Sequence, residues 1–150
     1  MSFWTHCSCR IFVVGTLSQL TKTESCFGKQ LNFEDSREKW NYACEHPEEF
    51  MPFGSEGSIE LLKTRKRRPI PDTEYYKDRY KKEYKFFGAL RDYNDENKVF
   101  KWFTDLIAKI NREPGYADII EADFEASGYG LIKFHFETDK EMLELNEVEP

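Results

Sequence analysis

Hydrophobic and polar residues alternate along several stretches of the chain, which is the pattern of β-strands in a packed sheet. The first stretch is SCRIFVVG, residues 8–15, in which Cys9, Ile11 and Val13 share one face. Because the positions between them are also largely apolar, we expect a central strand that is buried on both faces. Residues 16–33 are polar with scattered apolar side chains, and we interpret them as a loop.

Two further strands are expected in the central part of the chain. SIELLKTRKRR, residues 58–68, predicts a second strand, and Pro69 and Pro71 should end it because proline donates no backbone hydrogen bond. EYKFFGALRDY, residues 83–93, predicts a third strand that places three apolar side chains on one face: Tyr84, Phe86 and Leu90.

Helical spacing of apolar residues is clearest in the second half of the chain. Asn94 and Asp95 are N-cap candidates for a helix. After them, one apolar stripe on the helix surface contains Val99, Phe103, Leu106, Ile107 and Ile110. A shorter helix is expected within residues 34–46, where Asp35 is the N-cap candidate and Glu38 follows three positions later. Its expected core-facing residues are Trp40, Ala43 and Cys44.

The last part of the chain predicts a β-hairpin. Residues 116–138 form two alternating stretches separated by SGYG at 127–130. The order strand, helix, strand, strand, helix, strand, with one added strand, predicts an α+β fold. We expect an antiparallel sheet with two helices on one face, ferredoxin-like with an additional C-terminal strand. A single α+β domain should span residues 1–137, followed by an acidic C-terminal tail at 138–150.

Composition narrows the class of protein. The 150 residues, of which 39% are hydrophobic and 16% aromatic, are enough for one domain with a sizeable core. No apolar run reaches the roughly 18 residues that a membrane helix needs, and the first residues lack the pattern of a signal peptide. We therefore expect a soluble, cytoplasmic protein with no membrane partner, and reduced thiols at its four cysteines.

Charge is distributed unevenly along the chain. The net charge is −6, but residues 63–85, called the basic segment below, contain ten Lys or Arg and four Asp or Glu, so they carry +6 and the rest carries −12. Cations interleaved with aromatic rings are typical of nucleic-acid surfaces. The same alternation also produces a soluble hairpin with its rings inward. The candidate binding residues of the aromatic hairpin 63–87 are Arg65, Lys66, Arg67, Arg68, Tyr75, Tyr76, Lys77, Arg79, Lys81 and Lys82.

Soft metal ligands are concentrated in THCSC, at residues 5–9, and in CEH, at residues 44–46. A zinc site would use five of them: His6, Cys7, Cys9, Cys44 and His46. The spacing argues against such a site, because alternation along a strand places His6 on the face opposite Cys7 and Cys9. We expect packed thiols, no bound metal and no cofactor.

His6 and His135 form an alternative catalytic pair. HCS, at residues 6–8, resembles the histidine-x-serine element of two-histidine phosphoesterases, in which neighbouring strands supply an acid and a base. The second histidine departs from that pattern, because Glu137 occupies the position two residues after His135 and Thr138 follows. A nucleotide-binding protein or a small two-histidine phosphoesterase is therefore an alternative function.

Three short elements occur in order along the chain: FWTH at 3–6, FGSEGS at 53–58 and GALRDY at 88–93. They resemble a poorly characterised group of small bacteriophage proteins in which Trp-Thr-His, Gly-Ser-Glu-Gly and Gly-x-Leu-Arg-Asp elements recur. The resemblance implies a non-enzymatic, phage-encoded accessory protein in the cytoplasm of the host cell. Its expected partner is a host protein, which it would bind and inhibit, for instance in host defence.

The same elements also have an expected structural role. Gly54 and Gly57 permit backbone geometry at a strand entry that other residues resist. Arg91 and Asp92 are expected to brace the corner between the third strand and the following helix.

Overall fold

The computed structural model describes residues 3–30, 37–62, 66–74, 76–92, 96–112 and 114–137. Its strands are β1 (Trp4–Gly15), β2 (Glu60–Leu61), β3 (Arg68–Pro69), β4 (Tyr80–Arg91), β5 (Asp118–Ser127) and β6 (Leu131–Glu137). Its helices are α1 (Leu17–Glu24), α2 (Arg37–Glu45), the 3₁₀ turn η1 (Pro47–Glu49) and α3 (Glu96–Arg112). Within these residues, no helix combines the length and the apolar character needed to cross a membrane.

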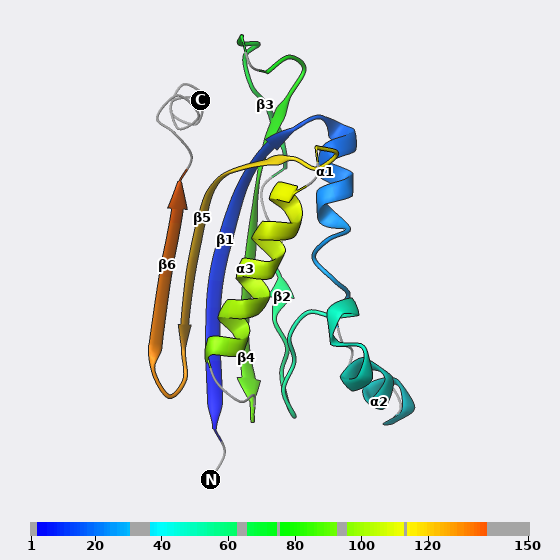
Figure 1. The fold of residues 1–150 in the computed structure, drawn as a ribbon, viewed down its shortest axis with the longest axis vertical. Coiled ribbons are helices and arrows are strands. Elements are labelled where there is room, and N and C mark those ends of the chain that lie inside the picture. The colour runs from blue at the N-terminus through cyan, green and yellow to red at the C-terminus, as the bar shows by residue number, and fades with distance from the viewer. Residues whose placement is uncertain are drawn as a thin grey trace.

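The strands form one antiparallel sheet in the order β2-β4-β1-β5-β6, and β3 pairs with the N-terminal end of β4. Because β1 is antiparallel to both β4 and β5, these two strands run in the same direction, and α3 connects them across β1. Figure 1 shows α3 lying on the face of the sheet that is turned toward the viewer. The α+β class and the antiparallel sheet are confirmed, whereas the ferredoxin-like arrangement stays a prediction.

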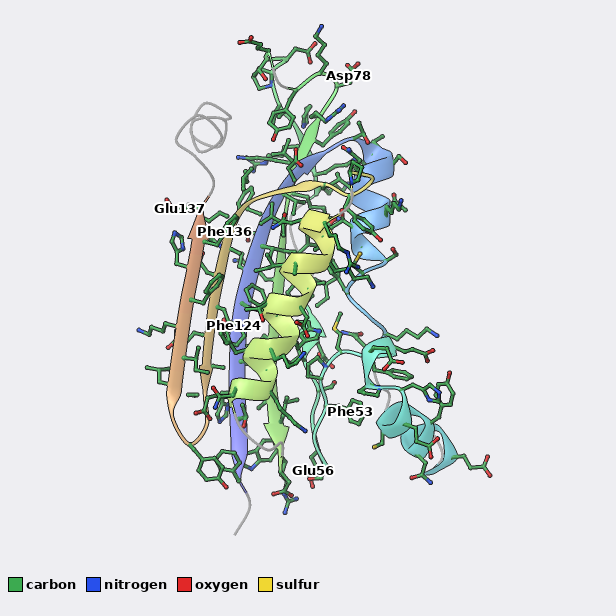
Figure 2. The ribbon with its side chains drawn as sticks, in the orientation of Figure 1. Phe53, Glu56, Asp78, Phe124, Phe136 and Glu137 are labelled. Carbon is green, nitrogen blue, oxygen red and sulfur yellow. The ribbon has the colours of Figure 1, made fainter. Side chains whose placement is uncertain are left out.

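One face of the sheet packs against α3 and α1 and holds the core. The stripe predicted along α3 is buried, and Phe103 and Val99 have no exposed surface. Phe103 stacks on Phe124 of β5 with their ring centroids 5.1 Å apart, and Figure 2 shows Phe124 beside α3. The predicted inward residues of β4 are buried as well. The sheet contributes alternate positions to this core: Cys7, Cys9, Ile11, Val13, Tyr84, Phe86, Leu90, Ala122, Phe124 and Ala126.

The opposite face of the sheet, called the open face below, is left without a helix over it among the described elements. On β1 it begins with Trp4, His6 and Ser8, which are exposed. Within the predicted strand, residues 8–15, this face is exposed at Ser8, partly buried at Arg10 and Phe12 and buried at Val14, so the predicted burial on both faces is confirmed only at its C-terminal end. Only at its C-terminal end does a cover form, where the hairpin before β4 packs a small cluster: Val14, Ile70, Tyr76 and Ile120.

Helix α1 was not expected, because residues 16–33 were interpreted as a loop. Its first turn is closed by a capping box: the Gln19 N–H donates to Thr16 Oγ1 at 3.1 Å, and the Thr16 N–H donates to Gln19 Oε1 at 2.8 Å. These two bonds satisfy backbone groups that would otherwise lack partners at the start of the helix. Capping thus compensates for the weakly amphipathic sequence of this helix.

Two other elements differ in detail from the prediction. The expected second strand is reduced to β2 and β3, which have two residues each, and Pro69 lies inside β3 rather than beyond it. The short helix is confirmed as α2, with Ala43 buried, but Cys44 is exposed rather than core-facing. The proposed cap, Asp35, and the acidic tail at 138–150 lie outside the described residues.

Candidate functional site

Large apolar side chains are exposed on the open face. Trp4 of β1 is 38% exposed, Leu62 beside β2 41%, Phe87 of β4 53% and Leu131 of β6 59%. The uncovered face of an antiparallel sheet normally presents polar residues to water. A group of exposed apolar residues rimmed by polar ones is typical of an interaction surface.

A shallow concavity of about 610 Å³ lies in the middle of this face. Ser8 of the central strand contributes to its floor. Phe87 and Leu62 line it on the β4 side, and Lys133 and His135 line it on the β6 side. The β4 side therefore combines these apolar side chains with Lys85, whereas the β6 side is lined mainly by Lys133 and His135.

Arg10 of β1 is the centre of an ion-pair cluster in this concavity. Its Nη2 lies 2.5 Å from Oε1 of Glu121 and 2.5 Å from Oδ2 of Asp123, and its Nη1 lies 3.5 Å from Oε2 of Glu83. The strand register explains the cluster, because Arg10 is directly opposite Asp123 on β5. Partial burial acts to lower the pKa of Arg10, but the carboxylates, first of all Asp123, outweigh it and raise the pKa.

His135 extends the cluster to the edge strand β6. Its Nδ1 lies 2.5 Å from Oδ1 of Asp123, and its Nε2 lies 2.6 Å from Oε1 of Glu137. Ionised carboxylates only accept hydrogen bonds, so an imidazolium with an N–H on each nitrogen satisfies both contacts. The hydrogen bond to Asp123, and then that to Glu137, raise the pKa of His135 above its ordinary value. Burial acts to raise the pKa of Asp123, but the hydrogen bonds from His135 and Arg10 outweigh it and lower the pKa.

The same cluster contains a possible set of metal ligands. Glu121, Asp123 and His135 each offer one ligand atom, and these atoms lie within 4.8 Å of one another. However, the guanidinium of Arg10 already contacts both carboxylates, and a metal ion would be repelled by it. We interpret the cluster as an ion-pair network that joins β1, β5 and β6 and fixes the shape of the concavity.

The network predicts a specific dependence on pH. Because the folded-state pKa of His135 is raised, its contribution to stability is complete below about pH 6.5 and is lost as the pH rises through the folded pKa. NMR titration of the His135 ring should give a pKa above 6.5, and Asp123→Asn should lower it by removing a charged partner. An identical His135 pKa in wild type and Asp123→Asn would contradict this arrangement.

The structure does not bring His6 and His135 together, although both lie on the open face. His6 is opposite Ser127 on β5, whereas His135 is opposite Asp123, four residues away along the same strand. The two histidines are also two strands apart, so their Cα atoms are separated by roughly 16 Å at ordinary strand spacings. An acid and a base that act on one phosphodiester must both reach it. In this structure both ring nitrogens of His135 contact carboxylates, and His6 does not line the concavity beside it.

The five candidate zinc ligands are also separated. Cys7 and Cys9 are 2% and 4% exposed in the core, whereas His6 is exposed on the open face. Cys44 and His46 lie at the end of α2 and just after it. Burial raises the pKa of the Cys9 thiol well above its ordinary value, which favours the thiol over the metal-binding thiolate. The predicted packing of Cys7 and Cys9 is confirmed.

Tyr76, the aromatic candidate of the basic segment that the structure describes, is less accessible than stacking on a nucleic-acid base requires. Tyr76 is only 4% exposed, and its hydroxyl donates to Oδ2 of Asp118 at 3.1 Å. It therefore covers the end of β1 and β5 and cannot stack on a base, contrary to its assignment from the sequence. Tyr75 and Arg65 lie outside the described residues.

The cations of the basic segment are spread over the hairpin and the edge of the sheet. At the hairpin tip, which Asp78 marks in Figure 2, Arg79 Nη1 donates to the carbonyl oxygen of Lys77 at 2.7 Å. The guanidinium of Arg67 lies over the ring of Tyr80, 5.7 Å from its centroid. The remaining described candidates gather near β3 and β4: Lys66, Arg68, Lys81 and Lys82.

The three elements that carry the bacteriophage resemblance meet at the end of the sheet where Figure 2 labels Glu56. The Ser55 N–H donates to the carbonyl oxygen of Arg91 at 2.8 Å, and the Arg91 N–H donates to that of Glu56 at 2.9 Å. The Asp92 N–H donates to the carbonyl oxygen of Phe3 at 2.7 Å. Arg91 also forms an ion pair with Glu56 at 2.6 Å. These residues therefore brace one corner of the sheet, with partners that the sequence does not reveal.

A larger groove, of about 810 Å³, lies on the helical side between α3 and the segment 47–55. Its apolar wall includes Phe27, Met51 and Trp102, which belong to the core or pack against it. Nothing in the described residues shows what fills this groove, and it carries no functional assignment.

Comparison of the chain with protein-family models, with curated proteins and with solved structures finds no match.

Proposed function

We propose that the protein is a non-enzymatic binding protein that holds a protein partner on its open face. The observation that carries the proposal is the exposure of Phe87 and Leu62 beside the concavity, on a face over which no described helix packs. Aromatic side chains contribute much of the binding free energy at protein interfaces because they bury a large apolar area. Phe87 is placed to make such a contribution.

Charges around the concavity indicate the chemistry of the partner. Lys85, which lies 3.3 Å from Glu83, and Lys133, which is opposite Glu125, are exposed on opposite sides of it. The lining contains Arg10, Lys85 and Lys133 against Asp123 and Glu125, so it is positive by one, and more so when His135 is protonated. We therefore propose a partner that packs an apolar side chain against Phe87 and presents acidic side chains to the two lysines. The resemblance to small bacteriophage proteins makes a host protein the proposed partner and inhibition of that protein the proposed consequence.

The enzymatic alternative has weaker support. His6 and His135, the pair that a phosphoesterase would require, are two strands apart and do not face a common concavity, since His135 lines it and His6 is not among its lining residues. A binding surface needs no such convergence, only accessible apolar area and complementary charge.

Phe87→Ser tests the proposal, with Leu17→Ser as the matched control. Leu17, on α1, is 44% exposed, so both substitutions remove an exposed apolar side chain, but only one lies on the open face. Proteins retained from a bacterial lysate by wild type should be retained by Leu17→Ser and lost by Phe87→Ser. For a purified partner we expect a loss of about 2 kcal/mol or more, roughly 30-fold in affinity.

Thermal melts of both variants would show whether the fold is intact, which is expected because each side chain is exposed. A partner that binds Phe87→Ser as tightly as wild type would contradict the proposed surface. Equal losses in Phe87→Ser and Leu17→Ser would also contradict it, since the effect would then not depend on the open face.

A further inference from the structure

A second, smaller pocket lies beside the concavity at the β3 end of β4. It has a volume of about 300 Å³ and is lined by Phe12, Glu83 and five cationic side chains: Lys66, Arg68, Lys81, Lys82 and Lys85. β3 pairs with β4 at Tyr80 and Lys81, and β2 pairs with it at Phe86 and Phe87, so the pocket opens on β4 between these two pairings. Residues distant in the basic segment therefore converge on one recess.

The charge of this lining is positive. Lys82 is opposite Val13, on the helical face of β4, and its ammonium pairs with Glu24 of α1 at 3.2 Å, so its charge is already compensated there. The four other cations and Glu83 give the recess a sum of +3. Glu83 is shared between Arg10 at 3.5 Å and Lys85 at 3.3 Å. Positive charge gathered in a recess with low-dielectric walls produces a stronger field than the same charge spread over a convex surface.

The pocket also has an aromatic wall. The Nζ atom of Lys81 lies 5.2 Å from the centroid of the Phe12 ring, which is only partly buried. A ring beside clustered cations is the combination that binds phosphate groups together with the bases attached to them. The sequence shows that cationic and aromatic residues are both present, but it does not show which of them lie next to each other in the fold.

We propose that this pocket binds phosphate groups, carried by a nucleotide or by the backbone of single-stranded nucleic acid. Phosphate suits the site because it offers several strong acceptor oxygens and more than one negative charge to the converging cations. The volume of about 300 Å³ lies at the lower end of the range for small-ligand sites. The chain as a whole carries a net charge of −6, so the positive lining of this recess differs from most of the molecule. Lys85 lines both the concavity and this pocket, but the site goes beyond the binding of a protein partner, and its test uses residues that line the pocket alone.

The test compares two double variants with the same change of charge. Lys66→Gln with Lys81→Gln removes two cations from the pocket, and Lys29→Gln with Lys109→Gln removes two exposed cations outside it. Each protein is titrated with a labelled short oligothymidylate, with ATP, and with polyglutamate as an anion that has no phosphate. The salt concentration is about 50 mM, at which phosphate contacts are screened less than at physiological salt. We expect the pocket variant to bind a phosphate probe about tenfold or more weakly than wild type, and the control variant to match wild type.

The salt dependence and the choice of probe complete the test. With oligothymidylate, loss of two phosphate contacts should reduce the slope of log affinity against log salt by about 1.4. Binding of ATP alone would identify a nucleotide as the source of the phosphate, and binding of the oligonucleotide without ATP would identify a nucleic acid. The proposal is overturned if neither probe binds, if both double variants weaken binding equally, or if polyglutamate binds as well as the phosphate probes.

Discussion

Phe103→Ala is expected to lower the free energy of unfolding by about 3 to 5 kcal/mol. Phe103 has no exposed surface, lies in the middle of the buried stripe of α3 and stacks on Phe124. Removal of the ring takes apolar area out of the core and leaves a cavity that the close-packed neighbours cannot fill. Denaturant unfolding monitored by circular dichroism would measure the change.

Trp102→Ala is the matched control for this prediction. Trp102 is the neighbouring residue on α3, is only partly buried and packs edge-on against Phe86 at the side of the core, with ring centroids 5.6 Å apart. Although tryptophan is the larger residue, its removal should cost clearly less stability because water can reach the space it leaves. Equal losses in the two variants would mean that α3 packs on the sheet through another face.

Gly57→Ala is expected to cost at least about 2 kcal/mol of stability, because two effects act together at this position. Gly57 has a φ of +77°, a conformation that residues with a Cβ rarely adopt. A Cβ there would also overlap the backbone carbonyl oxygen of Ala89 on β4. Since that oxygen belongs to a strand in the sheet, the corner at which FWTH, FGSEGS and GALRDY meet would have to shift.

Gly115→Ala separates this backbone effect from a general effect of adding a methyl group. At Gly115 the nearest atom to a new Cβ is the Nζ of Lys22, at 2.6 Å, which is the far end of a flexible side chain. We expect Gly115→Ala to change the melting temperature little and Gly57→Ala to lower it markedly. A Gly57→Ala variant as stable as wild type would contradict the close approach to Ala89.

Features that depend on local periodicity could be predicted from the sequence. The stripe through Val99 and Phe103 and the alternation of Tyr84 and Phe86 were correct, because each depends on residues a few positions apart. The capping signal of α1 was also present in the sequence, at Thr16 and Gln19, but the weak apolar pattern after it favoured a loop.

Features that depend on the pairing of distant segments could not be predicted in this way. The apolar Val14 suggested a strand buried on both faces, whereas its cover is Tyr76, from a hairpin more than 60 residues later. The Arg10 cluster likewise requires the register that places Asp123 opposite Arg10 and His135 opposite Asp123. Phe87 belongs to the aromatic hairpin 63–87 but was not among its named binding residues, because the sequence alone does not show which face of an alternating strand is covered.

The most direct test of the proposed binding surface is photo-crosslinking from two positions of the full chain. A photoreactive phenylalanine analogue replaces Phe87 on the open face in one protein and Leu17 on α1 in the other, and each is irradiated in the presence of the bacterial lysate. The account predicts that a protein retained by the wild-type chain is crosslinked from position 87 and not from position 17. Crosslinking of that protein from position 17, or from neither position, would contradict it.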